Sequence, residues 1–312
     1  MFWWKKNKNK KQQVPEDTQP EVPDTSTIKV VVKTDLGNVR TNNEDAGTFV
    51  KIADENVIRE KGYLLFVADG MGGHNAGEVA SKIALETISD EYFKKDSHAD
   101  KEKALSNAFV TANKKIYELA QANQSYKGMG TTCTVVVVAG QNIYFAHAGD
   151  SRAYIFKNET ITQITEDHTY VQQLVKNGDI TEAEAIVHPQ RNVLINAMGT
   201  KPTLRVDTGK AVLTFEKNDR LLLCSDGLYD YLSDEELAAA LFKNPLQEIA
   251  DYLIAEAKRR GGKDNITVVL AEKTETATEN ESKLTRDITL PDLTNGDDSL
   301  KLTRDADLPS DI

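Results

Sequence analysis

Five short patches, far apart in the chain, each place an acidic residue beside glycine or a small polar residue. Three of them follow apolar, β-like runs, which would hold a carboxylate at the rim of a core. Such a carboxylate is costly to desolvate unless a cation meets it. Carboxylates that converge in this way would form an oxygen-rich cage for hard divalent cations. The patches are 43–45, 69–73, 149–152, 225–227 and 264–265.

Composition narrows the range of functions. The 312 residues can form one large domain or two small ones. A formal charge of −11 argues against nonspecific nucleic-acid binding, which needs a basic surface. Cys133 and Cys224 both lie in apolar runs, so we interpret them as reduced core residues of a cytosolic protein. No Cys or His pair has zinc-ligand spacing.

Alternating strand and helix patterns must position the acidic patches. Helices are predicted over 76–93 and 101–122, after the Ser233 capping box, and from Pro245 to Arg260. The polar stretch 165–202 is predicted to be a surface flap near the acidic rim. The predicted strands are 28–34, 63–68, 131–139, 143–149, 152–156, 160–164, 221–224 and 266–271.

The two ends of the chain differ in composition from the middle. Residues 28–272 form the predicted domain, while 1–27 and 273–312 are predicted to be disordered. Tryptophans and five lysines within residues 1–11 suit a membrane interface with anionic lipid; the alternative is a start that touches nothing. No apolar run reaches the roughly 20 residues that span a bilayer, and no signal peptide is present.

The acidic tail contains a repeated pentapeptide, Lys-Leu-Thr-Arg-Asp, at 283–287 and 301–305. Its threonines, Thr285 and Thr303, lie in matched contexts. One hypothesis is that they are phosphorylated and then bound by a partner or dephosphorylated in cis. The alternative is that the tail is a solvated acidic spacer.

The ordered set of patches resembles the metal-dependent protein phosphatases of the type 2C family, especially the bacterial serine/threonine phosphatases. The resemblance covers roughly 33–269, and the flap also looks bacterial in type. The matching stretches are 35–45, 67–74, 130–132, 148–152, 167–168, 188–189, 191–193, 197–200, 224–227 and 264–265.

The resemblance implies an α+β fold. Its centre is an antiparallel β-sandwich flanked by helices on both faces, in four layers, with a small flap subdomain. By the same resemblance, Asp69 would bridge two metal ions, with the Gly70 carbonyl as a further ligand. Asp226 and Asp264 match ligands of the first ion.

The remaining site residues also follow from the resemblance. Glu44 and Asp45 match the side that holds the second ion, directly or through water. Asp150 matches a ligand of a third, weaker ion, and Arg40 matches the phosphate-binding arginine. Arg152 could bind substrate, but a structural salt bridge to the rim is favoured.

The chemistry of such a site can be stated in physical terms. Two divalent ions about 3.5 to 4 Å apart can share a water and lower its pKa, so that hydroxide attacks phosphorus in line without a phospho-enzyme intermediate. A guanidinium fork suits the equatorial phosphate oxygens. Oxygen-only ligands favour Mn²⁺ or Mg²⁺ over zinc.

The histidines need separate interpretations. Animal members carry histidine directly after the Asp-Gly pair, where this chain has Met71. His74 is a candidate for the general acid, but a metal-bound water is the favoured donor. His147 is expected to be a satisfied core residue, and His168 and His188 to shape the flap.

The leading hypothesis is a cytoplasmic, monomeric enzyme that hydrolyses phosphoserine and phosphothreonine in proteins. Its counterpart would be a serine/threonine kinase of the same bacterium, and residues 1–11 would allow peripheral contact with the inner face of the membrane. One alternative is a pseudophosphatase that binds phosphoproteins without turnover. Another is a phosphatase devoted to one regulatory protein.

Overall fold

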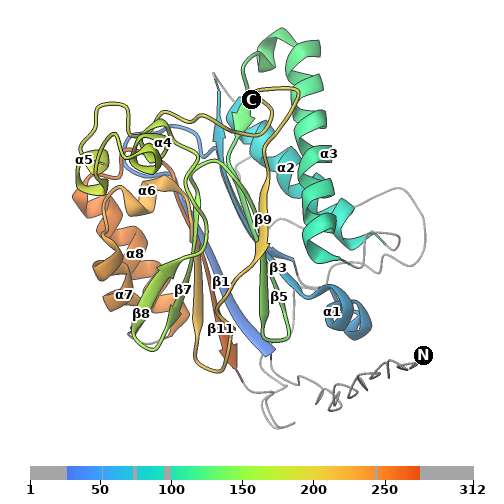
Figure 1. Ribbon diagram of the computed structural model, residues 1–312, viewed down its shortest axis with the longest axis vertical. Coiled ribbons are helices and arrows are strands. Elements are labelled where there is room, and N and C mark those ends of the chain that lie inside the picture. The colour runs from blue at the N-terminus through green and yellow to red at the C-terminus, as the bar shows by residue number, and fades with distance from the viewer. Residues whose placement is uncertain (1–26, 51, 73–75, 95–99, 243–244, 275–312) are drawn as a thin grey trace, which may run out of the picture.

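The computed structural model describes residues 27–50, 52–72, 76–94, 100–242 and 245–274 (Figure 1). Two antiparallel sheets face each other, one in the order β1-β11-β10-β7-β8 and the other in the order β2-β3-β5-β6-β9, with β4 paired to β3. The strands are β1 (Thr27–Asp35), β2 (Asp45–Val50), β3 (Tyr63–Met71), β4 (Gly130–Thr131), β5 (Cys133–Ala139), β6 (Asn142–Ala148), β7 (Arg152–Lys157), β8 (Thr160–Gln163), β9 (Asp207–Lys210), β10 (Arg220–Cys224) and β11 (Ile266–Thr274).

Helices cover the outer face of each sheet (Figure 1), which gives the predicted four layers. Helices α2 and α3 pack on the β3 sheet, and α7 and α8 on the β10 sheet. The helices are α1 (Glu55–Lys61), α2 (Ala76–Phe93), α3 (Lys101–Ala122), α4 (Tyr170–Asn177), α5 (Glu182–Ile186), α6 (Asp226–Tyr229), α7 (Asp234–Phe242) and α8 (Leu246–Arg260), with a 3₁₀ turn at Gln124–Tyr126.

Strand β3 is buried on both faces, which explains its unbroken apolar sequence. Leu64 and Phe66 point toward the α2–α3 layer, whereas Leu65 and Val67 point into the core between the sheets. Successive side chains of a strand alternate between faces, so a central strand with both faces covered is apolar throughout. The two cores hold the carboxyl end of β3 in a fixed place.

Several predicted boundaries are confirmed. Helices α2 and α3 have the predicted limits, and α8 follows Pro245 and ends before Gly261. The Ser233 capping box opens α7: Ser233 N donates to Glu236 Oε2 at 3.0 Å, and Glu236 N donates back to Ser233 Oγ at 3.4 Å.

Other elements differ from the prediction. The single strand expected over 131–139 is two strands, because Thr132 breaks the ladder between β4 and β5. Its hydroxyl accepts from Asp69 N at 2.8 Å and bonds Ser151 Oγ at 2.7 Å. Elements β2, α1 and β9 carry weak periodicity and were not predicted. No helix within the described residues is long and apolar enough to cross a membrane.

Candidate active site

The pairing of β2 with β3 places two of the predicted ligands side by side. Asp45 lies directly opposite Asp69 in the register, and facing residues of an antiparallel pair have Cβ atoms about 4.5–5.5 Å apart. The Asp69 backbone is fixed on both sides: its N–H donates to Thr132 Oγ1 at 2.8 Å, and its carbonyl accepts from Thr131 Oγ1 at 2.9 Å. The carboxylate at the end of β3 therefore sits on a rigid base.

The opposite sheet supplies two more carboxylates to the same rim. Asp226 is the first residue of α6, directly after β10, and Asp264 lies just before β11. Because β10 and β11 are antiparallel neighbours, the end of one and the start of the other share an edge. Asp226 lies near enough to Asp69 to help raise the pKa of Asp69, and Asp264 helps raise the pKa of both.

Asn265 ties the loop that carries Arg40 and Glu44 to the start of β11. Its amide nitrogen donates to Leu36 O at 3.1 Å and to Asn42 O at 3.0 Å. Its amide oxygen accepts from Glu44 N at 2.8 Å. In the sequence, Asn265 stands out only as the neighbour of Asp264. Its three backbone partners make it a positioning residue, which spacing alone does not reveal.

Glu44 is held against the first turn of α2 by close backbone contacts. Its carbonyl accepts from Gly70 N at 3.1 Å and from Ser81 Oγ at 2.7 Å. A Cβ on Gly77 would lie 2.7 Å from the Glu44 carboxyl carbon, and one on Gly70 would lie 2.2 Å from Gly77 O. Neither position has room for a Cβ atom, because the backbone of α2 packs directly against the backbone of the rim, so glycine is required at both.

Burial and mutual repulsion make these carboxyl groups reluctant to ionise. Burial raises the pKa of Asp69 and of Asp226 well above the usual range, and neighbouring aspartates add to the effect. Burial also raises the pKa of Asp45 to about 6 and that of Asp150 to about 7. Four acids in this state fit a cation site, since bound cations would offset both the cost of burial and the mutual repulsion of the carboxylates.

Two buried carboxylate oxygens point to the same conclusion. Among the described residues, Asp45 Oδ1 and Asp226 Oδ1 have no hydrogen-bond partner. Buried polar atoms rarely lack partners, so orphaned oxygens mark a place built for a ligand. The donor set consists of oxygens alone, which fits Mg²⁺ or Mn²⁺.

The carboxylates are near one another without forming a closed cage. Within the part of the chain that the structure describes, no three His, Cys, Asp or Glu side chains are grouped closely enough to hold an ion. Two rim acids are engaged by protein groups instead. Asp45 Oδ2 accepts from Ser225 Oγ at 2.7 Å, and Asp264 Oδ2 accepts from Arg40 Nη2 at 2.7 Å.

Arg40 therefore reaches the rim, and its role in phosphate binding stays a prediction. Its side chain is 48% exposed, and its pKa is raised, first by the hydrogen bond to Asp264. An exposed guanidinium beside a carboxylate cluster can exchange a protein partner for a phosphate oxygen. Arg40 is the arginine that the structure places against Asp264.

Arg152 makes a structural salt bridge, but its partner is Asp167 at the start of the flap segment and not a carboxylate of the rim. Its guanidinium binds Asp167 through Nε at 3.0 Å and Nη2 at 2.7 Å, and stacks on the Tyr229 ring with its carbon 3.7 Å from the centroid. The Tyr229 hydroxyl donates to Asp150 O at 3.1 Å. The Asp150 loop is thus linked through Tyr229 and Arg152 to the start of the flap.

The histidines have different outcomes. His74 lies outside the described residues, so its role as an acid stays a prediction. His147 is fully buried, as expected, but it is not fully satisfied: Nδ1 bonds Thr134 Oγ1 at 2.8 Å, whereas Nε2 has no partner among the described residues. His168 is 2% exposed and lies at the flap root, which is the start (165–169) of the flap segment 165–202. His188 lies farther along the flap, near Tyr170.

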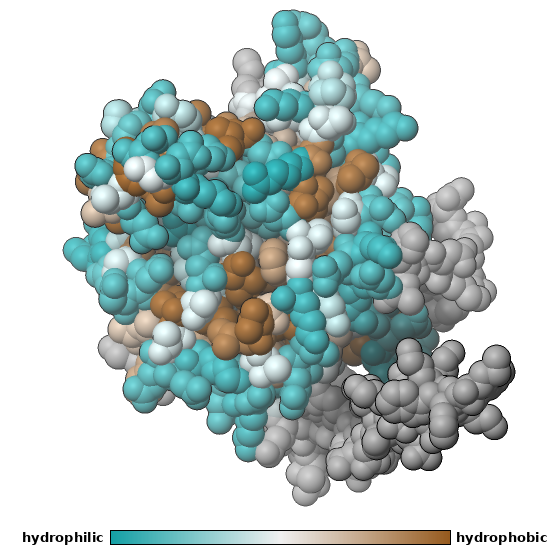
Figure 2. Space-filling model, viewed as in Figure 1, coloured by the Kyte–Doolittle hydropathy of each residue, from teal (hydrophilic) through white to brown (hydrophobic). Residues whose placement is uncertain are grey.

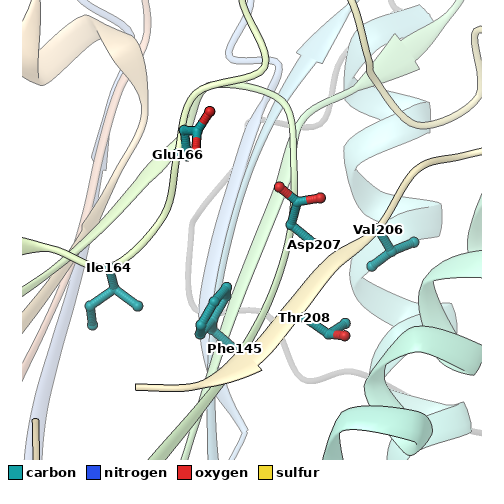
Figure 3. Close-up of a pocket in the computed structure, with 6 residues that line it drawn as sticks. All are labelled: Phe145, Ile164, Glu166, Val206, Asp207 and Thr208. Carbon is teal, nitrogen blue, oxygen red and sulfur yellow. The ribbon is translucent and has the colours of Figure 1, made fainter. Parts of the chain in front are cut away.

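A separate pocket of about 450 Å³ opens between the edge strands of the two sheets (Figure 3). Glu166 and Asp207 lie at one end of it, and Phe145 and Ile164 form an apolar wall. Figure 2 shows apolar residues gathered near the middle of this face. The predicted metal-site residues do not line this pocket, so it is distinct from the carboxylate rim.

Comparisons with known proteins agree on one family. Residues 30–174 match the family model for protein phosphatase 2C. The chain is 38% identical over 245 residues to a serine/threonine phosphatase of Listeria innocua, covering 77% of this chain and 94% of that protein. A solved serine/threonine phosphatase of S. agalactiae superposes with a TM-score of 0.72 at 37% identity, over 79% of this chain and 99% of that one.

A further solved structure carries metal. The catalytic domain of the serine/threonine protein phosphatase PstP, solved in complex with two manganese ions, superposes with a TM-score of 0.67 at 36% identity. The match covers 80% of this chain and all of that domain.

Proposed function

The chain belongs to the protein phosphatase 2C family of metal-dependent serine/threonine phosphatases, and we propose that its carboxylate rim hydrolyses phosphoserine and phosphothreonine in proteins. The observation that carries this proposal is the pair of orphaned oxygens, Asp45 Oδ1 and Asp226 Oδ1, beside two further acids with raised pKa values. A binding module has no need for carboxylates held in so costly a state. The pseudophosphatase alternative is therefore not favoured.

The rim carries the proposed metal ligands. Asp69, Asp226 and Asp264 would hold one divalent ion, and Asp69 with Glu44, Asp45 and the Gly70 carbonyl would hold a second. Asp150 would hold a third, weaker one. When bound, such ions would lower the pKa of a water molecule enough to make hydroxide available for attack on phosphorus at neutral pH.

Arg40 has the substrate-facing role in this proposal. Its guanidinium would leave Asp264 and donate two hydrogen bonds to the phosphoryl oxygens, where charge must be held during transfer. Asn265 keeps the Arg40 loop in reach, and the paired strands keep Asp69 and Asp45 in place. In this proposal, these residues bind and orient the phosphate group.

Phosphoproteins are the substrates, and a serine/threonine kinase of the same cell would be the counterpart. Membrane contact through residues 1–11 and phosphorylation of Thr285 and Thr303 both fall outside the described residues and stay predictions.

Hydrolysis of p-nitrophenyl phosphate and of a phosphothreonine peptide tests the proposal. We expect turnover that requires Mn²⁺, is abolished by chelator and falls at least about 1,000-fold in Asp226→Asn, since a metal ligand supplies several kcal/mol of transition-state stabilisation. Asp251→Asn, on the exposed face of α8, is the matched control and should retain full activity. Absence of turnover in the wild-type chain with Mn²⁺ would instead support the pseudophosphatase.

A further inference from the structure

Every polar group of His168 is bonded at the place where the flap leaves the sandwich. Its backbone N donates to Gly149 O at 2.7 Å, and its carbonyl accepts from Ile195 N at 2.9 Å. On the ring, Nδ1 lies 3.1 Å from Gly149 N and 2.8 Å from Asn196 Nδ2. The remaining nitrogen, Nε2, lies 3.0 Å from Asp207 Oδ2 and 3.2 Å from Arg205 Nη2. One buried side chain thus joins the flap, the β6–β7 loop and β9.

These contacts define which ring nitrogen carries the proton. Gly149 N and Asn196 Nδ2 are both donors, so Nδ1 must accept and carries no hydrogen. The amide of Asn196 is oriented by a second pair of bonds, because Nδ2 donates to Arg205 O at 2.9 Å and Oδ1 accepts from Arg205 N at 3.3 Å. His168 is therefore a neutral imidazole with its proton on Nε2, donated to Asp207.

Two charged groups face Nε2. Asp207 accepts its proton, and Arg205 Nη2, which lies 3.2 Å from Nε2, donates at 2.9 Å to the same Asp207 Oδ2, so it needs no acceptor on the ring. Arg205 donates to Asp207 at 2.9 Å, and this hydrogen bond, with that from His168, holds the pKa of Asp207 well below its usual range. Asp207 is thus an ionised acceptor at the edge of the pocket in Figure 3. On β6, burial lowers the pKa of His147 to about 3, so the ring 4.8 Å from His168 is also neutral. Glu166, next to the flap root, pairs with Lys176 at 2.7 Å.

Gly149 transmits this arrangement to the rim. Its φ of +117° suits glycine, and a Cβ there would lie 2.5 Å from the Thr132 side chain, so the backbone has little room to move. The next residue is Asp150. Because both the N–H and the carbonyl of Gly149 bond His168, the position of Asp150 depends on the histidine ring and its tautomer.

We propose that His168 is a positioning residue of the phosphatase, which locks the flap root to Gly149 and so holds Asp150 at the rim. The proposal rests on the proposed metal-binding role of Asp150. It assigns a specific task to each ring nitrogen: Nδ1 fixes the Asp150 loop, and Nε2 anchors the ring to β9.

Two substitutions separate these tasks. The amide oxygen of Asn in His168→Asn can accept where Nδ1 does, whereas the amide NH₂ of Gln in His168→Gln can donate where Nε2 does. Mn²⁺ binding can be measured from the electron paramagnetic resonance signal of free Mn²⁺. We expect His168→Gln to raise the Mn²⁺ concentration for half-maximal binding about tenfold, because two hydrogen bonds near Asp150 are lost. His168→Asn should stay within about threefold of wild type, and His188→Asn, a flap histidine off this path, should match wild type.

Two measurements on the wild-type chain need neither a variant nor activity. Nitrogen-15 spectra of the five histidines should show His168 as the neutral form protonated on Nε2, and the Gly149 amide should exchange slowly with solvent. In His168→Gln that amide should exchange faster, with the melting temperature used to confirm folding. A proton on Nδ1, a fast-exchanging Gly149 amide, or equal effects of the Asn and Gln variants on Mn²⁺ binding would overturn the proposal. Failure of the proposed function would appear separately, as loss of turnover with this spectrum intact.

Discussion

The carboxylate rim and the flap root lie close together but are built on opposite plans. At the rim, Asp45 and Asp226 each leave a buried oxygen without a partner among the described residues. At the flap root, the ring and backbone of His168 are satisfied throughout. Polar groups that are all hydrogen-bonded make a structure rigid and specific, whereas buried carboxylates without a partner favour the binding of a cation. One set of residues, at the rim, would therefore bind ligands, and an adjoining set, at the flap root, holds those residues in position.

The largest effect is expected at Arg40, which belongs to the ligand-binding residues of the rim. Arg40→Ala removes the proposed phosphate donor, and loss of one transition-state donor costs about 100- to 1,000-fold in turnover. We therefore expect kcat/KM for a phosphothreonine peptide to fall by about that factor. Arg40→Lys keeps the charge without the fork and should recover only part of the loss. Arg259→Ala, an exposed arginine on α8, is the control; equal activity of Arg40→Ala and wild type would remove Arg40 from the chemistry.

A smaller effect concerns the pH dependence of stability without metal. The folded-state pKa of Asp45 is about 6 and that of Asp150 about 7, both above the ordinary 3.8. The folded chain thus binds more protons than the unfolded chain between pH 4 and 7, so its stability should fall as pH rises through this window. For Asp45 alone the loss is on the order of 3 kcal/mol.

Thermal melting in chelator checks this expectation. The melting temperature should be lower at pH 8 than at pH 5, and Mn²⁺ should raise it more at pH 8, where the acids are ionised. A melting temperature that rises from pH 5 to pH 8 in chelator would contradict the raised pKa values of the rim carboxyl groups.

The smallest effect is expected at an exposed ion pair of the flap. Lys176 binds Glu166 at 2.7 Å, but both side chains are roughly half exposed. Such pairs contribute less than about 1 kcal/mol. Lys176→Ala should therefore leave the melting temperature and Mn²⁺ affinity nearly unchanged. A large loss of Mn²⁺ affinity in this variant would mean that flap rigidity depends on its surface, and not on the His168 network.

The sequence predicted most of the framework because its signals are local. The periodicity of α3 and α8 and the apolar run of β3 each report burial on a known face. The weak strand β2 was not predicted, although it carries Asp45, because the pairing of β2 with β3 creates that strand and its own pattern does not.

Within the site, residue types could be predicted but their supports could not. Asp69 and Asp226 stand out because acids follow apolar runs. The three backbone partners of Asn265 come from loop residues more than 200 positions away, and the Nδ1 contacts of His168 come from two different segments. Such supports depend on tertiary contacts, and no local spacing encodes them. The same holds for His147, which was expected to be satisfied but whose Nε2 has no partner within the described part of the chain.

One measurement tests the central claim most directly: anomalous scattering from crystals of the full chain grown with Mn²⁺. The account predicts two strong peaks bordered by the carboxylates of Asp69, Asp226 and Asp264, with Asp45 Oδ1 and Asp226 Oδ1 turned toward them. Well-ordered crystals in which those side chains bind no manganese, or in which the ions lie elsewhere, would contradict it.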